Sequence, residues 1–188
     1  MILSKKDLKE FLNVELSYYG VGLKIYLPIN IGENQILAKH IKLLRYTEYF
    51  YNTKKNICAY ISRIRLLRLQ NKYGIHIPIN TFDCGLHIMH LGPILVNSKA
   101  CIGKNCAIHI NTAIVAGGID SQCPNLGDNI TIGIGATLLG GITIEDGVAI
   151  GANALVNKSI DKKNVTIAGN PAKIISANSS FDWNKSKV

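Results

Sequence analysis

Several kinds of segment are absent from this chain of 188 residues. No apolar run approaches the roughly 20 residues that a membrane-spanning helix needs. The N-terminal stretch MILSKKDLKEFL carries charges where a secretion signal has its apolar stretch, so we do not expect secretion. The five cysteines are odd in number and form no C-x-x-C pair, which favours reduced thiols in a cytoplasm and disfavours a zinc site. No G-x-G-x-x-G or Walker motif indicates a nucleotide site.

Acidic residues are scarce, and the net charge of +9 is unevenly distributed. Residues 1–80 hold 13 Lys and Arg against 5 Asp and Glu, whereas residues 81–160 hold 3 against 5. Residues 161–188 again have a basic excess, 5 against 2. The chain therefore contains two kinds of segment, and its nearly charge-free middle lacks the diffuse basic surface of a nucleic-acid binder. We expect no nucleic-acid partner.

Residues 1–74 have helical periodicity. Ser4 followed by Asp7 predicts a capping box that opens a short helix running through Leu12. Two further helical patterns follow, and the last ends at Gly74, a natural C-terminal stop. Its basic side chains lie mostly away from one apolar face, which consists of Ile57, Tyr60, Ile61, Ile64 and Leu67. We expect a small, basic, helical region.

From about Ile75 the helical periodicity disappears and aliphatic residues recur every six positions. These anchors are Val96, Ile102, Ile108, Ile114, Leu126, Ile132, Leu138, Ile144, Ile150 and Val156. Small or turn-compatible residues follow most of them, and compact residues often stand four positions beyond. A period of six fits neither a helix nor a two-sided strand. It predicts a solenoid in which three hexads, about 18 residues, close one triangular coil and the anchors stack inside.

The six-residue series is interrupted between Ile114 and Leu126, where Asp120 occupies the middle position. An unpaired carboxylate in an aliphatic ladder costs several kcal/mol. We therefore expect a loop extruded from the prism over residues 115–125. Loops on rigid scaffolds often carry function.

The segment from Ile75 to Ile175 resembles the hexapeptide-repeat acyltransferases, and most closely their serine acetyltransferase-like branch. The resemblance rests on the hexads, on the stretch GLHIMHLG and on the closing AGNPAKI. It implies a left-handed parallel β-helix, so the expected fold is mainly β with a small α-helical N-terminal region. We expect the helical region at 1–74, the β-helix at 75–175 and a tail at 176–188. The resemblance also implies a homotrimer, or a dimer of trimers, with acetyl-CoA in grooves between prisms and no metal requirement.

His90 is the candidate catalytic base, because it matches the family's catalytic histidine within GLHIMHLG. An imidazole titrates near pH 6.5 and can take a proton from an acceptor hydroxyl. The resemblance implies that this hydroxyl attacks the thioester carbonyl directly. The alternative is a structural histidine, since counting back six from Val96 places His90 in an inward slot of a regular coil. We expect His109 on the outer surface and interpret His40 and His76 as scaffold.

The candidates for acceptor binding are His87, Asp83, Asp120 and Cys123. The two aspartates could also orient His90. Serine-specific members carry an acid directly before the base and another about fifteen residues upstream, where this chain has Met89 and Ile75. They also carry a histidine where Cys123 precedes the loop-closing proline. Because carboxylates for the ammonium group of serine are missing, we expect an uncharged acceptor hydroxyl, on a sugar of a surface polysaccharide.

The candidates for contacting acetyl-CoA are Gly117, Gly118, Ile134, Ala152, Lys158 and Lys173. The two glycines open the extruded loop and permit close approach of the pantetheine arm. By resemblance, Ile134 and Ala152 lie along the same groove. The lysines could meet the CoA phosphates, although a solvated surface charge explains each of them equally well.

These residues predict an acetyl-CoA-dependent O-acetyltransferase acting on a sugar hydroxyl. One alternative is a serine O-acetyltransferase of cysteine biosynthesis, and a second is a non-catalytic β-helix that serves as an assembly scaffold. A third is a nucleic-acid or membrane-surface binder that uses the basic helix at residues 63–72. We expect a cytoplasmic protein whose basic N-terminal region could hold it at the inner face of an anionic membrane.

Overall fold

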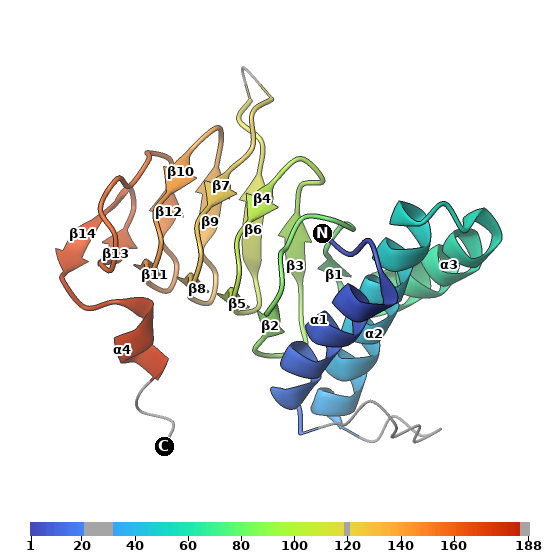
Figure 1. Ribbon diagram of the computed structural model, residues 1–188. Coiled ribbons are helices and arrows are strands. Elements are labelled where there is room, and N and C mark those ends of the chain that lie inside the picture. Colours follow the sequence, from blue (N-terminus) through green and yellow to red (C-terminus); the bar gives the residue numbers. More distant parts are fainter. Residues whose placement is uncertain (21–31, 119–120, 185–188) are drawn as a thin grey trace.

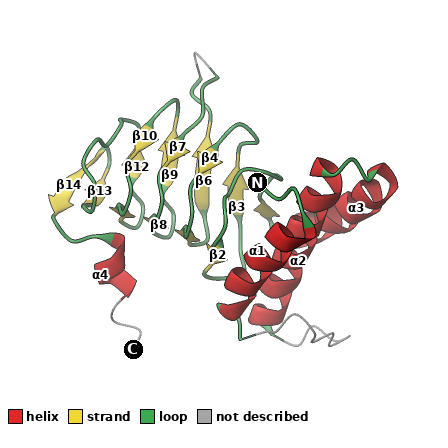
Figure 2. Ribbon diagram, viewed as in Figure 1, coloured by secondary structure: helices red, strands yellow, loops and turns green. Residues whose placement is uncertain are grey.

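The computed structural model describes residues 1–20, 32–118 and 121–184. Three N-terminal helices lie at one end of a prism of short strands, and one short helix follows the last strand at the other end (Figures 1 and 2). These helices are α1 (Lys5–Ser17), α2 (Glu33–Asn52), α3 (Asn56–Tyr73) and α4 (Ser180–Asn184). No helix in the described ranges is long and apolar enough to cross a membrane.

The helix boundaries follow local signals in the sequence. Ser4 Oγ accepts the Asp7 N–H at 3.1 Å and Asp7 Oδ2 accepts the Ser4 N–H at 2.9 Å, which confirms the predicted capping box. Gly74 ends α3 in the left-handed region with φ 73°. The first helix runs beyond Leu12 because its last turns bury Glu15 and pack against the rest of the molecule.

The strands form three walls of parallel hydrogen-bonded sheet. The first wall contains β1 (Ile75–His76), β3 (Ile94–Val96), β6 (Thr112–Val115), β9 (Thr137–Leu139) and β12 (Leu155–Val156). The second contains β4 (Cys101–Ile102), β7 (Asn125–Leu126) and β10 (Thr143–Ile144). The third contains β2 (His87–Ile88), β5 (Ala107–Ile108), β8 (Thr131–Ile132), β11 (Ala149–Ile150), β13 (Thr166–Gly169) and the antiparallel closing strand β14 (Ala172–Ser176).

The walls enclose the predicted aliphatic ladders. All ten anchors are buried, with exposed fractions of 4% or less, so the hexad interpretation is confirmed. The chain turns between walls at residues in the left-handed region, such as Asn105 (φ 55°), Asn129 (φ 58°) and Gly147 (φ 71°). These residues stand three positions beyond an anchor, where asparagine and glycine tolerate positive φ. The result is a left-handed parallel β-helix.

The glycines directly after the anchors serve close stacking rather than turning. A Cβ on Gly133 would lie 2.7 Å from the Ile150 carbonyl oxygen, and one on Gly103 would lie 2.7 Å from the Gly127 backbone. Both approaches are shorter than side chains tolerate. Successive coils therefore pack backbone to backbone at these positions.

Between β6 and β7 the chain leaves the prism as a projecting hairpin (Figure 1). The Gly117 N–H donates to the Gln122 carbonyl at 3.0 Å across its base. Asp120, the residue from which we predicted this loop, lies outside the described residues.

The third helix packs on the protein with a side other than the apolar face that its sequence shows. Its buried residues are Ser62, Leu66 and Gln70, and Gln70 Nε2 donates to the Ile77 carbonyl at 2.7 Å. The apolar face seen in the sequence points to solvent, with Ile57 exposed by 78% and Tyr60 by 69%. Within the described residues, the core does not cover this outward apolar face.

A buried charge network joins the helices to the first coil. Arg45 of α2 lies 2.6 Å from Glu15 of α1 and 2.8 Å from Glu48, with the Arg45 and Glu15 side chains fully buried. Burial alone would lower the pKa of Arg45, but the two carboxylates raise it, so the guanidinium stays charged. Its Nη1 and Nη2 also donate to the carbonyls of Phe82 and Asp83, each at 3.0 Å. The network therefore crosses from helix to prism.

Backbone N–H groups of the first coil also donate hydrogen bonds to both carboxylates. Glu15 Oε1 accepts the N–H groups of Gly85 and Leu86, each at 3.0 Å. Glu48 Oε1 accepts the Asn80 N–H at 2.8 Å. Because every charged atom is partnered, removing any one member would leave an uncompensated buried charge.

Substituting Arg45 by methionine should therefore destabilise the protein by about 3–5 kcal/mol, since Glu15 and Glu48 would stay buried without their cation. Urea unfolding followed by circular dichroism measures this. Arg63→Met, at an exposed position of α3, is the matched control and should change stability by less than about 0.5 kcal/mol. An Arg45→Met protein as stable as this control would contradict the assigned role.

The buried His40 of α2 predicts a pH dependence of stability. Burial and the neighbouring Arg45 lower the pKa of His40 to about 4, against 6.5 for the ordinary side chain. Between these values the unfolded chain binds a proton that the folded chain does not. The free energy of unfolding should thus fall by up to about 1.4 kcal/mol per unit as the pH drops from 6.5 towards 4. Denaturant titrations at several pH values should show a shallower dependence for His40→Leu; an unchanged slope would contradict the prediction.

Candidate active site

One edge of the prism, between the third and first walls, carries three of the predicted site residues. His90 follows β2, Ile134 follows β8 and Ala152 follows β11, and His109 follows β5 at the same turn. We call this line of four residues the histidine edge. Backbone bonds connect its levels: Met89 N donates to Ile108 O at 2.9 Å, and Asn153 N to Ile134 O at 2.8 Å. The edge is thus a rigid line of turns.

His90 stands at the helical end of this edge and faces solvent. Its side chain is 59% exposed, so it does not occupy the inward slot of the structural alternative; Ile88 fills the interior there. The rings of His90 and His109 lie 5.9 Å apart at 43°. His109 is half-buried at the edge, in agreement with the outward position expected for it.

A carboxylate that the sequence analysis did not find lies beside His90. Glu33, the first residue of α2, has its Oε1 3.5 Å from His90 Nδ1, and its side chain is 42% exposed. The same oxygen accepts the N–H of Leu91 in a short hydrogen bond. Glu33 precedes His90 by 57 positions, so a helix from a distant part of the chain supplies an acidic partner at the candidate base.

The position of β2 is set by aromatic residues at the end of α1. Tyr19 Oη donates to the Ile88 carbonyl at 3.1 Å and accepts the Ile88 N–H at 3.0 Å. Burial raises the pKa of Tyr19 well above its ordinary value, so the phenol remains a donor. The ring of His87 stacks on Tyr18 at 4.4 Å. His87, predicted to bind the acceptor, is therefore held in this contact, two positions before the half-buried Met89.

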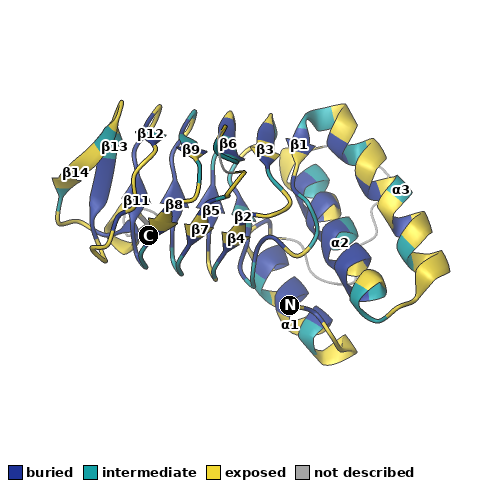
Figure 3. Ribbon diagram, turned by 90° about the horizontal axis from the view of Figure 1, so that it is seen from above, coloured by how far each residue is buried: buried dark blue, intermediate teal, exposed yellow. Residues whose placement is uncertain are grey.

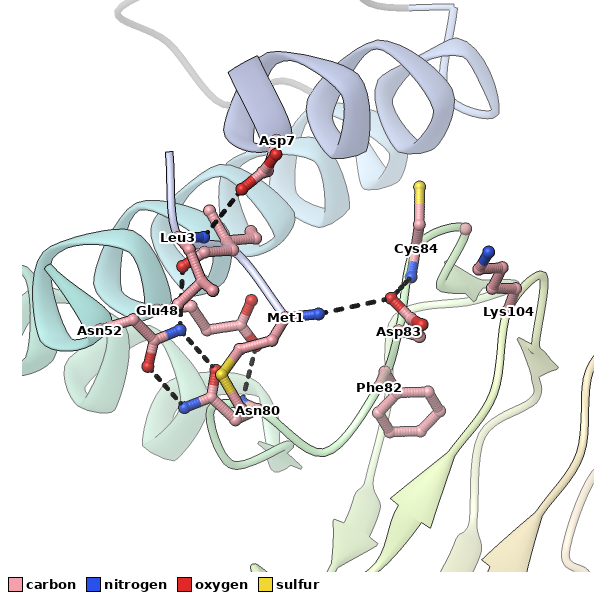
Figure 4. Close-up of polar contacts among 12 residues, drawn as sticks. Met1, Leu3, Asp7, Glu48, Asn52, Asn80, Phe82, Asp83, Cys84 and Lys104 are labelled. Carbon is pink, nitrogen blue, oxygen red and sulfur yellow. Dashed lines mark hydrogen bonds and ion pairs between the residues drawn. The ribbon is translucent and has the colours of Figure 1, made fainter. Parts of the chain in front are cut away.

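Asp83 lies on a different edge of the prism, between the second and third walls. Its Oδ1 accepts the Cys84 N–H at 2.8 Å and lies 3.7 Å from the amino group of Met1 (Figure 4). Its contacts are thus with the N-terminal segment, and the carboxylate beside His90 belongs to Glu33. A small hollow opens here, lined by residues that include Phe11, Phe82 and Cys101. Asp120, the other predicted orienter, lies outside the described residues.

The remaining candidates lie away from the histidine edge. Gly117, Gly118 and Cys123 belong to the hairpin between the first and second walls, and Lys158 follows β12 on that same side. Cys123 is half-buried against the core, whereas Lys158 is exposed. Lys173 is exposed on β14, opposite Ala168. Within one chain, His90 therefore shares an edge of the prism with Ile134 and Ala152, whereas the hairpin lies on a different edge.

The two positions at which this chain lacks the acids of serine-specific members, Met89 and Ile75, hold half-buried and buried apolar side chains. Ile75, fifteen residues before His90, is 1% exposed inside the prism in β1. Within the described ranges, no group of three or more His, Cys, Asp or Glu side chains could hold a metal ion. At the histidine edge, the exposed imidazole of His90 has the Glu33 carboxylate as its acidic neighbour.

The fold and this edge define the class: the chain is a left-handed β-helix protein of hexapeptide repeats. Among solved structures, serine acetyltransferase from Brucella abortus superposes with a TM-score of 0.72, 21% identity and coverage of 94% of this chain and 72% of that one. A serine acetyltransferase in complex with CoA gives a TM-score of 0.70 at 19% identity, with coverage of 91% and 71%. At these identities the likeness shows the fold.

Sequence comparison identifies the branch. Serine acetyltransferase of Buchnera aphidicola is 30% identical over 142 residues, which cover 72% of this chain and 52% of that protein. The Staphylococcus aureus enzyme is 33% identical over 128 residues, 66% of this chain and 58% of that protein. No family model matches. The predicted resemblance to the hexapeptide-repeat acyltransferases, on their serine acetyltransferase-like branch, is confirmed, and the chain spans about half the length of these curated relatives.

Proposed function

We propose that the chain transfers an acetyl group from acetyl-CoA to the hydroxyl of serine. Its relatives in sequence are serine acetyltransferases. The observation that carries the proposal is the exposed His90 beside the Glu33 carboxylate, at the end of an edge of exposed turns. This arrangement has the two groups that general-base catalysis of alcohol attack requires, a base and a group that stabilises its charged form.

In the proposed reaction, His90 Nε2 takes the proton of the acceptor hydroxyl as its oxygen bonds to the acetyl carbon. The carbon–sulfur bond of the thioester then breaks, and the departing CoA thiolate receives the proton from His90. The imidazolium exists only between these two transfers. The 3.5 Å contact of Nδ1 with Glu33 is a positioning interaction that favours this charged form and leaves Nε2 for the acceptor.

The histidine edge is the proposed binding line for acetyl-CoA. Ile134 is 43% exposed and Ala152 is exposed, so backbone groups at these turns can pair with the amides of a pantetheine arm. One structural neighbour is described as a complex with CoA. In the proposed homotrimer, the hairpin of an adjacent copy with Gly117, Gly118 and Cys123 would complete the groove. Lys158 and Lys173 are proposed to meet the CoA phosphates.

Serine replaces the polysaccharide sugar as the preferred acceptor. The prediction of a sugar acceptor rested on the absence of carboxylates for the ammonium group of serine, and no comparison supports that prediction. Glu33 supplies a carboxylate beside the base, and its partly exposed side chain can also face an ammonium group. An uncharged hydroxyl remains the second candidate acceptor, favoured by Met89 and by the buried Ile75 at the two positions where serine-specific members carry acids.

Replacing His90 by alanine should lower acetyl transfer by about 10²–10⁴-fold, because the acceptor hydroxyl loses its base. The measurement is thiol release from acetyl-CoA with L-serine as acceptor, with a panel of sugars in parallel. His76→Ala, which changes an exposed histidine of the first wall, is the matched control and should retain the rate.

Three outcomes would count against parts of this proposal. Retention of more than about a tenth of the rate in His90→Ala would exclude His90 as the base. Transfer to sugars but not to serine would favour the second acceptor. Absence of thiol release with every acceptor, from a folded protein, would favour the non-catalytic scaffold.

Replacing Glu33 by glutamine should lower kcat about five- to tenfold and leave KM for acetyl-CoA unchanged, since the imidazolium formed during transfer loses its carboxylate. Glu33→Asp, which keeps the charge, should recover part of kcat. Glu10→Gln, at an exposed position of α1, is the control for loss of one surface carboxylate. An equal loss in Glu33→Asp and Glu33→Gln would contradict an electrostatic role, and a rise in KM for serine alone would assign Glu33 to the ammonium group.

A further inference from the structure

The outer face of α3 combines exposed apolar and basic side chains. Four apolar side chains are exposed there: Ile57 by 78%, Tyr60 by 69%, Ile61 by 51% and Leu67 by 42%. Three arginines and one lysine stand among and beside them, namely Arg63, Arg65, Arg68 and Lys72. Figure 3 shows the helix at the end of the molecule, with exposed residues along its outer side. We call these eight residues the α3 face.

The packed side of the helix does not cover these apolar side chains. Ser62, Leu66 and Gln70 are buried there, and Leu69 and Tyr73 are half-buried beside them. Exposed apolar side chains cost free energy in water, and a contiguous group of them indicates a surface that becomes covered. Folding of the described chain leaves the group uncovered.

The charge around the face restricts what can cover it. Residues 49–82 contain six basic side chains and no acidic ones. A second copy of this face would bring arginines opposite arginines with no carboxylate on either helix to pair them. A nucleic acid would meet the arginines but leave Ile57 and Ile61 without apolar contacts. The observations favour an occupant that is anionic at its surface and apolar just beneath.

We propose that the α3 face docks on the surface of an anionic lipid bilayer. The helix would lie in the plane of the interface, with Ile57, Tyr60, Ile61 and Leu67 at the boundary of headgroups and acyl chains and the basic side chains at the lipid phosphates. Lys54 and Lys55, in the turn that leads into α3, add two cations at its N-terminal end. The histidine edge is on a different part of the molecule, so docking and acetyl transfer are independent proposals.

The test is co-sedimentation of the full chain with vesicles. The protein should pellet with vesicles of phosphatidylglycerol and phosphatidylcholine at about 0.1 M salt, and not with pure phosphatidylcholine. Arg65→Glu with Arg68→Glu should lower the partition coefficient by at least about tenfold, since each cation near an anionic surface contributes roughly fivefold. Ile57→Ser with Ile61→Ser should also lower it several-fold, which separates docking from purely electrostatic adsorption.

All four changed side chains are at solvent-exposed positions, so the variants should fold, as circular dichroism would verify. Lys6→Glu with Lys9→Glu, on the exposed side of α1, makes the same charge change elsewhere and should leave vesicle binding near that of the unchanged protein. Acetyl transfer should persist in the α3 variants. Failure to bind anionic vesicles, or an equal loss in the α1 control, would overturn the proposal. The proposal would also be overturned if the α3 variants sedimented without lipid at a lower mass than the unchanged protein, which would assign the face to contact with another copy. Displacement of the protein from vesicles by RNA would overturn it as well.

Discussion

The buried contact of Arg45 with Glu15 and Glu48 is the interaction on which the arrangement of the molecule depends. It joins α1, α2 and the first coil, and it uses both side-chain charges and the backbone of residues 80–86. Charged groups taken out of water must keep their partners, so these three parts have little freedom to move relative to one another. Beside it lies the ring of Phe11, 5.0 Å from the guanidinium carbon. A helical region that could otherwise pack in several ways is held in one position.

That position has consequences at both ends of the helices. The end of α1 presents Tyr19 to Ile88, so the strand before His90 is held by a side chain from outside the prism. The start of α2, twelve residues and about 18 Å of helix from Arg45, presents Glu33 to His90. The prism supplies rigid turns, and the helices supply the acidic group. In the proposed reaction the prism contributes the base, His90, and the helices contribute its acidic partner, Glu33.

The comparisons and the geometry together changed the interpretation of the acceptor. Met89 and Ile75 predicted an acceptor other than serine, because neither position, at fixed spacing from the base, carries a carboxylate. Ile75 is inside the first wall, where a carboxylate would be costly, and the acid near His90 comes from another region of the chain. The relatives in sequence are named serine acetyltransferases, and serine is the proposed acceptor. The exposed α3 face remains outside this chemistry and indicates a surface role.

The amino-acid sequence by itself determined the β-helix, the ten anchors, the capping box of α1 and the extruded segment after β6. Each of these depends on near neighbours or on a short period, because a six-residue repeat places equivalent side chains at equivalent heights in every coil. Tertiary structure decided what depends on distant segments meeting: the burial of Arg45, the outward turn of the α3 apolar face and the approach of Glu33 to His90. Periodicity shows that a helix has two faces, but it does not show which face packs on the core. The contact between Glu33 and His90 joins positions 57 residues apart and leaves no local pattern in the sequence.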